Sequence, residues 1–122
     1  MNIDNLIGKN VEVIISEPEQ FYLVNGEGPF ISTIIYAKDD YLLLKLNDKL
    51  MFKDRAIMHL SGMLRHAGCS INDLFDDKEI IMNFIPILYD KENDSLSNED
   101  LLVNASKWRE GFLIGDLRLT KK

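Results

Sequence analysis

The sequence predicts a mainly β domain of the α+β class, in which a small β-barrel over residues 8–61 is extended by a C-terminal strand–helix–strand unit over residues 62–122. The first observation is that short apolar strands alternate in the barrel span with turn residues at 25–26, 39–40 and 47–48. The second is length, since 122 residues support one domain with one hydrophobic core. We therefore expect a single domain whose C-terminal unit packs over one end of the barrel.

The N-terminal segment predicts a turn followed by the first strand. Residues 3–8 are expected to form a short turn, with Leu6 and Ile7 covering one end of the barrel. Residues 10–16 are predicted to form a strand because apolar side chains recur at every second position. Pro18 ends this strand, since proline cannot donate a hydrogen bond to a central ladder.

The middle of the barrel span predicts further strands joined by tight turns. Residues 21–24 are expected to form a short strand, and residues 25–26 are Asn-Gly, which is typical of a type I′ hairpin turn. Residues 30–38 are rich in β-branched and aromatic side chains and predict a strand. One tight turn then leads into a strand at residues 41–46, and a second precedes residues 50–52.

Residues 54–67 fit two structures. As a strand, this segment returns to close the barrel. As a helix, it begins with Asp54 at the N-cap, has apolar residues at helical spacing and ends before Gly68. We interpret it as a strand to about Ser61 followed by a short helical piece over residues 62–67, and the helical alternative stays open.

The C-terminal unit predicts two strands and two helices. A short capped helix is expected at residues 71–76, followed by a β-rich run at residues 79–89. Pro86 indicates that this run bends or lies at an edge of the sheet. A longer helix is predicted at residues 98–109, and residues 112–119 form the closing strand.

The first half of the chain resembles the Sm-like small barrel, a fold close to the SH3-like barrel. The resemblance covers residues 6–13 and 30–60, with residues 39–44 similar to the first Sm motif and residues 52–57 similar to the second. It implies a small barrel and, in that family, RNA binding. A leucine replaces the base-contacting Asn of the first motif, and an Asp stands in the second where the family has cationic residues. Tight RNA binding is therefore not expected.

The charge of the chain argues against nucleic acid as a partner. The net charge is −6, and nonspecific binding to nucleic acid depends on clustered Lys and Arg. Residues 55–77 are faintly similar to a helix-turn-helix, but its recognition face would carry acids, so DNA binding is not expected. The acidic stretch over residues 73–100 is either a solvated surface or a negative face for a basic protein.

The chain is expected to be cytoplasmic, with no membrane partner. Its N-terminus has no basic leader, and no run approaches the ~20 apolar residues that span a bilayer. Cys69 is the single cysteine, so it has no internal disulfide partner, which fits a reducing compartment.

No residue pattern predicts catalysis, a metal or another cofactor. His59, His66 and Cys69 match no standard zinc spacing, and Cys69 is interpreted as a small buried hydrophobe rather than a nucleophile with His66 as its base. The carboxylate pairs lie in predicted turns, where solvation does not raise a carboxyl pKa for acid chemistry. We expect a protein that is not an enzyme.

The function expected from these observations is a non-enzymatic protein-interaction module whose partner is another protein with a basic surface. One alternative is an acidic inhibitor, of the immunity or phage anti-defence type, that blocks a basic cleft of its target. The other alternative is an Sm-like RNA-binding protein, and the oligomeric state is left open. The candidate partner-binding residues come from the acidic stretch and from the 17–30 loop, and they are Asp73, Asp76, Asp77, Glu79, Tyr22 and Glu27.

Overall fold

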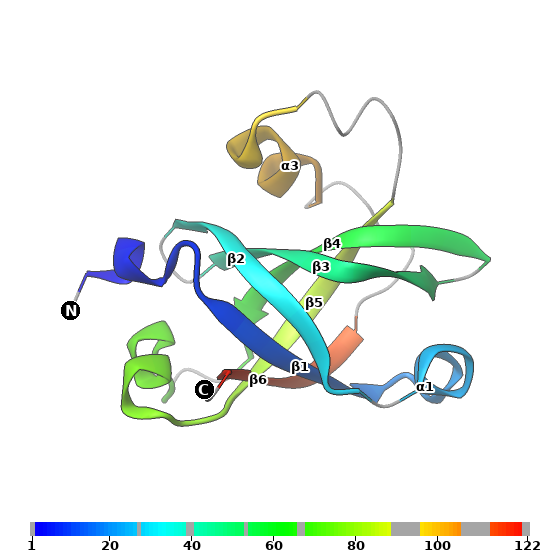
Figure 1. Ribbon diagram of the computed structural model, residues 1–122, viewed down its shortest axis with the longest axis horizontal. Helices are drawn as coiled ribbons and strands as arrows, with labels where there is room; N and C mark the ends of the chain where they lie inside the picture. The colour runs from blue at the N-terminus through cyan, green and yellow to red at the C-terminus, as the bar shows by residue number, and fades with distance from the viewer. Residues whose placement is uncertain are drawn as a thin grey trace.

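The computed structural model describes most of the chain as a set of short helices and longer strands (Figure 1). The described residues are 2–26, 28–38, 41–52, 54–65, 68–88, 96–105 and 113–120. The helices are η1 (Ile3–Leu6), α1 (Glu19–Asn25), η2 (Ile71–Asp76) and α3 (Asn98–Ala105), where η denotes a 3₁₀ helix. The strands are β1 (Asn10–Glu17), β2 (Phe30–Lys38), β3 (Tyr41–Phe52), β4 (Arg55–Leu64), β5 (Ile80–Leu88) and β6 (Leu113–Leu119).

The six strands form one closed antiparallel barrel. Each strand pairs with its neighbours in the sequence, and β6 pairs back with β1 to close the ring. In this closing seam Val11 lies opposite Leu119 and Val13 opposite Leu117. Closure removes the unpaired sheet edges that an open sheet would expose. The predicted mainly β class and small barrel are confirmed.

The barrel extends beyond the predicted residues 8–61. The order strand–helix–strand in the C-terminal half is present as β5, α3 and β6, but the two strands complete the barrel instead of packing over its end. The physical reason is that apolar side chains of β5 and β6 are needed to fill the core. The buried residues of β5 and β6 that belong to the main core are Ile80, Met82, Phe84, Leu113 and Leu117.

The alternation in β1 and the turn at the N-terminus are found as predicted. Val11, Val13 and Ile15 all point into the core, and residues at intervening positions are more exposed. Leu6, in η1, is completely buried and covers one end of the barrel. Ile7 was expected to join it, but it is 45% exposed. The other residue of η1 that packs against the core is Ile3, which is partly buried.

The prediction of a strand at residues 21–24 is wrong, because this segment lies in helix α1. The helix turns Phe21 inward, where its ring contacts the rings of Phe30 and Phe52 at centroid distances of 6.0 and 6.3 Å. The predicted Asn-Gly hairpin turn is also absent. Gly26 instead forms the C-cap of α1 with φ +86°, a conformation that favours glycine at a helix end.

The predicted tight turn at residues 47–48 is not present, because β3 runs on to Phe52. Pairing with β4 is irregular between Lys45 and Leu50, and the exposed residues in between occupy this irregularity. Polar turn-forming residues are tolerated there because their side chains face solvent. The predicted turn at residues 39–40 lies outside the described residues.

The helical alternative for residues 54–67 is wrong over β4, which runs to Leu64, and so is the helical piece expected from residue 62. Residues 66–67 lie outside the described residues. Strand β4 continues past Ser61 and pairs with β5 as far as Leu64. The missing side chain of Gly62 leaves room for those of Met82 and Phe84, since a Cβ there would lie 3.1 Å from side-chain atoms of both.

The remaining C-terminal predictions agree with the structure where it describes them. Helix η2 begins with a capping box between Ser70 and Asp73. Pro86 lies opposite Leu60 of β4, whereas the residues that would face it across β5 and β6 lie outside the described residues, so the expected bend or edge position stays a prediction. Helix α3 covers the start of the predicted helix over 98–109, and residues 106–109 are not described.

Helix α3 lies outside the barrel and packs on a second, smaller apolar cluster (Figure 1). This cluster joins Leu43 of β3, Ile87 of β5 and Leu101 of α3. Asn98 also donates a hydrogen bond to the carbonyl of Ile35 at 3.0 Å. None of the helices in the described ranges has the length and apolar character needed to cross a lipid bilayer.

Candidate functional site

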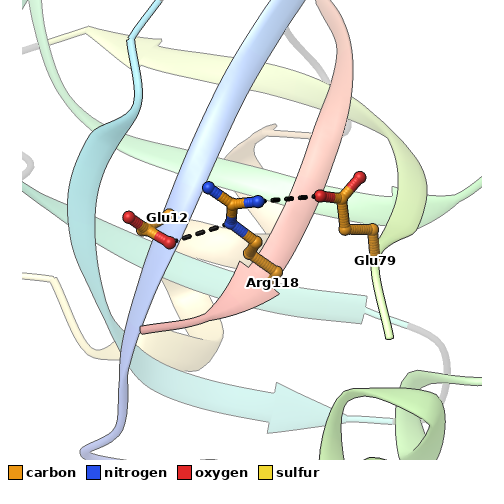
Figure 2. A network of polar contacts seen from close by, with 3 residues as sticks. All are labelled: Glu12, Glu79 and Arg118. Atoms are coloured by element: carbon orange, nitrogen blue, oxygen red, sulfur yellow. Dashed lines mark hydrogen bonds and ion pairs between the residues drawn. The ribbon is translucent and has the colours of Figure 1, made fainter. Parts of the chain in front are cut away.

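A network of one arginine and two carboxylates crosses the seam that closes the barrel (Figure 2). Arg118 lies directly opposite Glu12 in the β1–β6 register. Its Nε donates to Glu12 Oε2 at 2.8 Å, and its Nη1 donates to Glu79 Oε1 at 2.9 Å. Charge-assisted hydrogen bonds of this kind are the stronger ones in proteins, and they raise the pKa of the guanidinium. The network joins β1, β6 and the start of β5 on the outside of the barrel.

The network borders a surface hollow of about 290 Å³. Among the described residues that line this hollow, three carry a carboxylate and one carries a guanidinium, so their summed charge is negative. Because Arg118 already bonds to two of the carboxylates, the third, Asp77, is the least neutralised by it. The residues that line the hollow are Glu12, Asp77, Glu79, Arg118 and Leu119.

Asp116 adds to the negative charge of this side of the barrel. It precedes Arg118 by two residues on β6, so both side chains project from the same face of the strand. Partial burial raises the pKa of Asp116, and the nearby charge of Glu79 raises it further. Burial is the larger of the two causes, and the smaller one shows that the charge of Glu79 also acts on Asp116.

The predicted acidic residues lie together around η2, but they differ in exposure and in the hydrogen bonds that they make. Asp76, Asp77 and Glu79 are exposed. Asp73 is half-buried, and its Oδ2 accepts a hydrogen bond from the Ser70 backbone at 3.2 Å, so it serves the cap of η2. Asp77 ends η2 in a left-handed conformation with φ 59°.

The two halves of the predicted partner-binding set do not meet. Tyr22 is half-buried on α1, and Figure 1 shows α1 at the opposite end of the barrel from η2, which is coloured green. Glu27 lies outside the described residues. The structure therefore presents two separate candidate surfaces, one around η2 and one on α1.

Helix α1 exposes apolar side chains that the sequence did not single out. Leu23 and Val24 are 71% and 68% exposed, and Met51, at the end of β3, is 40% exposed. Asn25 ties the helix to this strand: its Nδ2 donates to the Met51 carbonyl at 2.7 Å, and its Oδ1 accepts from the Met51 backbone N–H at 2.8 Å. The exposed pair thus lies on a helix that is held in place.

Among the described residues, no group of three or more His, Cys, Asp or Glu side chains is placed to hold a metal ion. His66, one of the three candidate ligands considered from the sequence, is not described. Cys69 is a free cysteine, and its interpretation as a buried residue is wrong, because it is partly exposed. The expectations of no metal, no cofactor and no catalysis stay predictions.

Comparisons with protein families, with curated proteins and with solved structures find no match to this chain.

Proposed function

We propose that this chain is a non-enzymatic protein-interaction module that binds a partner protein through a basic surface of that partner. The observation that carries the proposal is the hollow beside η2, where Asp77, Glu79 and Glu12 face a single guanidinium. Asp76 directly precedes Asp77 in the sequence, is exposed and adds negative charge. Lys and Arg side chains of a partner complement such a surface.

The filled interior of the barrel supports binding on the outer surface. The main core takes apolar side chains from all six strands, and interiors of small barrels are filled in this way. The net charge of −6 also supports a basic partner, since opposite charge accelerates the diffusional encounter of two proteins. An acidic inhibitor of a basic cleft is the narrower form of the same proposal.

Kinship with the Sm-like or SH3-like barrels is part of the proposal for the fold. The sequential pairing of antiparallel strands in a small closed barrel is compatible with it. The RNA-binding alternative has less support, because the carboxylates around η2 would repel phosphates.

The proposal is tested with the double variant Asp76→Lys/Asp77→Asn. Asp76 is exposed, and Asn tolerates the left-handed conformation that Asp77 adopts. Glu79 is left unchanged because Lys at this position would face Arg118. We expect association with a partner isolated from native cells to slow by about tenfold or more at low salt, measured by stopped flow, with the melting temperature preserved.

A matched control carries the same charge change at the other end of the barrel. It is Asp48→Lys/Asp54→Asn, in which both residues are exposed and Asp54 has a left-handed φ of 64°. The control should leave the association rate within about twofold of the parent. Equal slowing in both variants would mean that total charge, and not the hollow beside η2, governs the encounter. If the partner is an enzyme or a nucleic-acid-binding protein, loss of its activity on binding would establish the inhibitor form.

A further inference from the structure

Helix α1 carries a second surface with a different chemistry from the hollow. Its solvent face consists of Glu19, Gln20, Leu23 and Val24, which are all exposed. Glu19 and Leu23 are four residues apart, and so are Gln20 and Val24, so each polar residue lies one turn from an apolar one. Large apolar side chains exposed side by side mark interaction sites when polar residues rim them.

The helix presents these side chains in a fixed position. Phe21 anchors its inner face in the aromatic group with Phe30 and Phe52. The side-chain amide of Asn25 makes three hydrogen bonds, one to the Phe21 carbonyl at 3.0 Å and two to the backbone of Met51. A binding surface held in one position spends less conformational entropy on binding.

We propose that the exposed face of α1, with Met51 beside it, docks a short segment of a partner protein that carries apolar side chains next to a Lys or Arg. The apolar part of the segment covers Leu23, Val24 and Met51. Its cationic residue meets Glu19 at the start of α1, with Glu17 at the end of β1 adding negative charge. Helix α1 carries no cation, and exposed Lys49 lies on the Met51 side of the surface, away from where the cationic residue is placed. This proposal rests on the proposed interaction function and adds a second contact surface to it.

A second copy of the chain fits this surface less well than a short segment of another protein. Each copy has a net charge of −6, so two copies repel. A stable interface of standard size takes roughly 800 Å² and 20–30 residues from each partner, far more than three apolar side chains provide. A short apolar and basic segment matches both the extent and the charge of the α1 surface.

The probe is a library of random 12-residue peptides displayed on phage and selected on the immobilised full-length protein. We expect the enriched peptides to share two or more apolar residues within a few positions of a Lys or Arg. Synthetic versions should lose affinity at least about tenfold for Leu23→Ser/Val24→Ser, because side chains at the centre of an interface contribute most of its binding energy. Fluorescence anisotropy measures the dissociation constants.

Three further proteins make the result decisive. Leu23→Met/Val24→Ile keeps the surface apolar and should retain binding. Ile7→Ser/Ile81→Ser removes exposed apolar side chains elsewhere, at positions 45% and 40% exposed, and should also retain it. Asp76→Lys/Asp77→Asn changes only the hollow beside η2 and should bind the peptides like the parent. The comparison uses only variants whose melting temperature equals that of the parent.

The opposite results would overturn the proposal. Enriched peptides that bind Leu23→Ser/Val24→Ser as tightly as the parent, or a selection that enriches no apolar and basic motif, exclude α1 as the docking surface. Concentration-dependent dimerisation in sedimentation, abolished by the same variant, assigns the surface to a second copy. If peptides bind and only the Asp76→Lys/Asp77→Asn variant fails, the interaction function stands and the α1 proposal falls.

Discussion

At the scale of single residues, the closing seam depends on Gly115 of β6. This glycine lies opposite Ile15 of β1, where the two backbones approach very closely. A Cβ at position 115 would overlap the carbonyl oxygen of Ile14 and lie 3.1 Å from the Cα of Ile15. Backbone atoms cannot move aside as the tip of a flexible side chain can. The close pairing of the first and last strands therefore requires glycine at position 115.

We predict that Gly115→Ala lowers the free energy of unfolding by about 3 kcal/mol, as overpacking against backbone does. Urea denaturation followed by circular dichroism measures the effect. Gly68→Ala is the matched control, because a Cβ at Gly68 meets no atom within 4 Å, and it should stay within about 0.5 kcal/mol of the parent. Similar unfolding midpoints for the two variants would contradict the close approach at the seam.

At the scale of elements, the sequence predicted the strands better than the connections between them. Alternation in β1 was readable because one face of the strand is buried and the other is solvated. The four residues 21–24 were assigned wrongly because so short an apolar run has no distinguishable period, and the aromatic contacts that hold Phe21 come from β2 and β3. Contacts with residues of other strands cannot be predicted from the residue types of the segment itself.

The candidate site was predictable to a similar extent. Asp76, Asp77 and Glu79 were found from the density of acidic residues alone. Their neighbours Glu12 and Arg118 were missed, since they meet only when β1 pairs with β6, 106 positions apart in the sequence. The available signal was weak: each occupies an outward position in a predicted strand, and the two charges are opposite.

The attachment of α1 to β3 is the element-scale feature most open to test. We predict that Asn25→Ala lowers the free energy of unfolding by about 1–2 kcal/mol, because the backbone N–H and C=O of Met51 lose their side-chain partners. The amide proton of Met51 should also exchange with solvent faster than in the parent. Native-state hydrogen exchange followed by NMR measures this.

Gln20→Ala serves as the control for Asn25→Ala, since Gln20 is exposed on the same helix. It should leave the exchange of the Met51 amide unchanged. Parent-like exchange in Asn25→Ala itself would show that α1 is held without its C-terminal amide, and the fixed presentation of Leu23 and Val24 would then rest on Phe21 alone.

At the scale of the whole molecule, the closed barrel connects the two candidate surfaces through one core. The hollow beside η2 is built on the seam of β1, β5 and β6, whereas α1 rests on β1 and β3. Strand β1 supports both surfaces, so the two surfaces belong to one folded unit. The arrangement predicts that the chain folds as one unit and that residues 8–61 do not form the barrel alone.

We predict that a fragment of residues 1–64 is unfolded. Without β5 and β6, strands β1 and β4 become open edges, and the core loses the buried side chains that those two strands supply. A circular permutant opened after residue 65, with the original ends joined by a short flexible linker, is the matched control. It breaks the chain near the same place but keeps all six strands. The start of β1 lies beside the end of β6, since the backbone N–H of Thr120 donates to the Asn10 carbonyl at 3.0 Å. The permutant should melt cooperatively and give dispersed amide signals in NMR, and the fragment should do neither. A cooperative thermal transition in the fragment alone would show that the first four strands form an independent barrel, as the sequence had suggested.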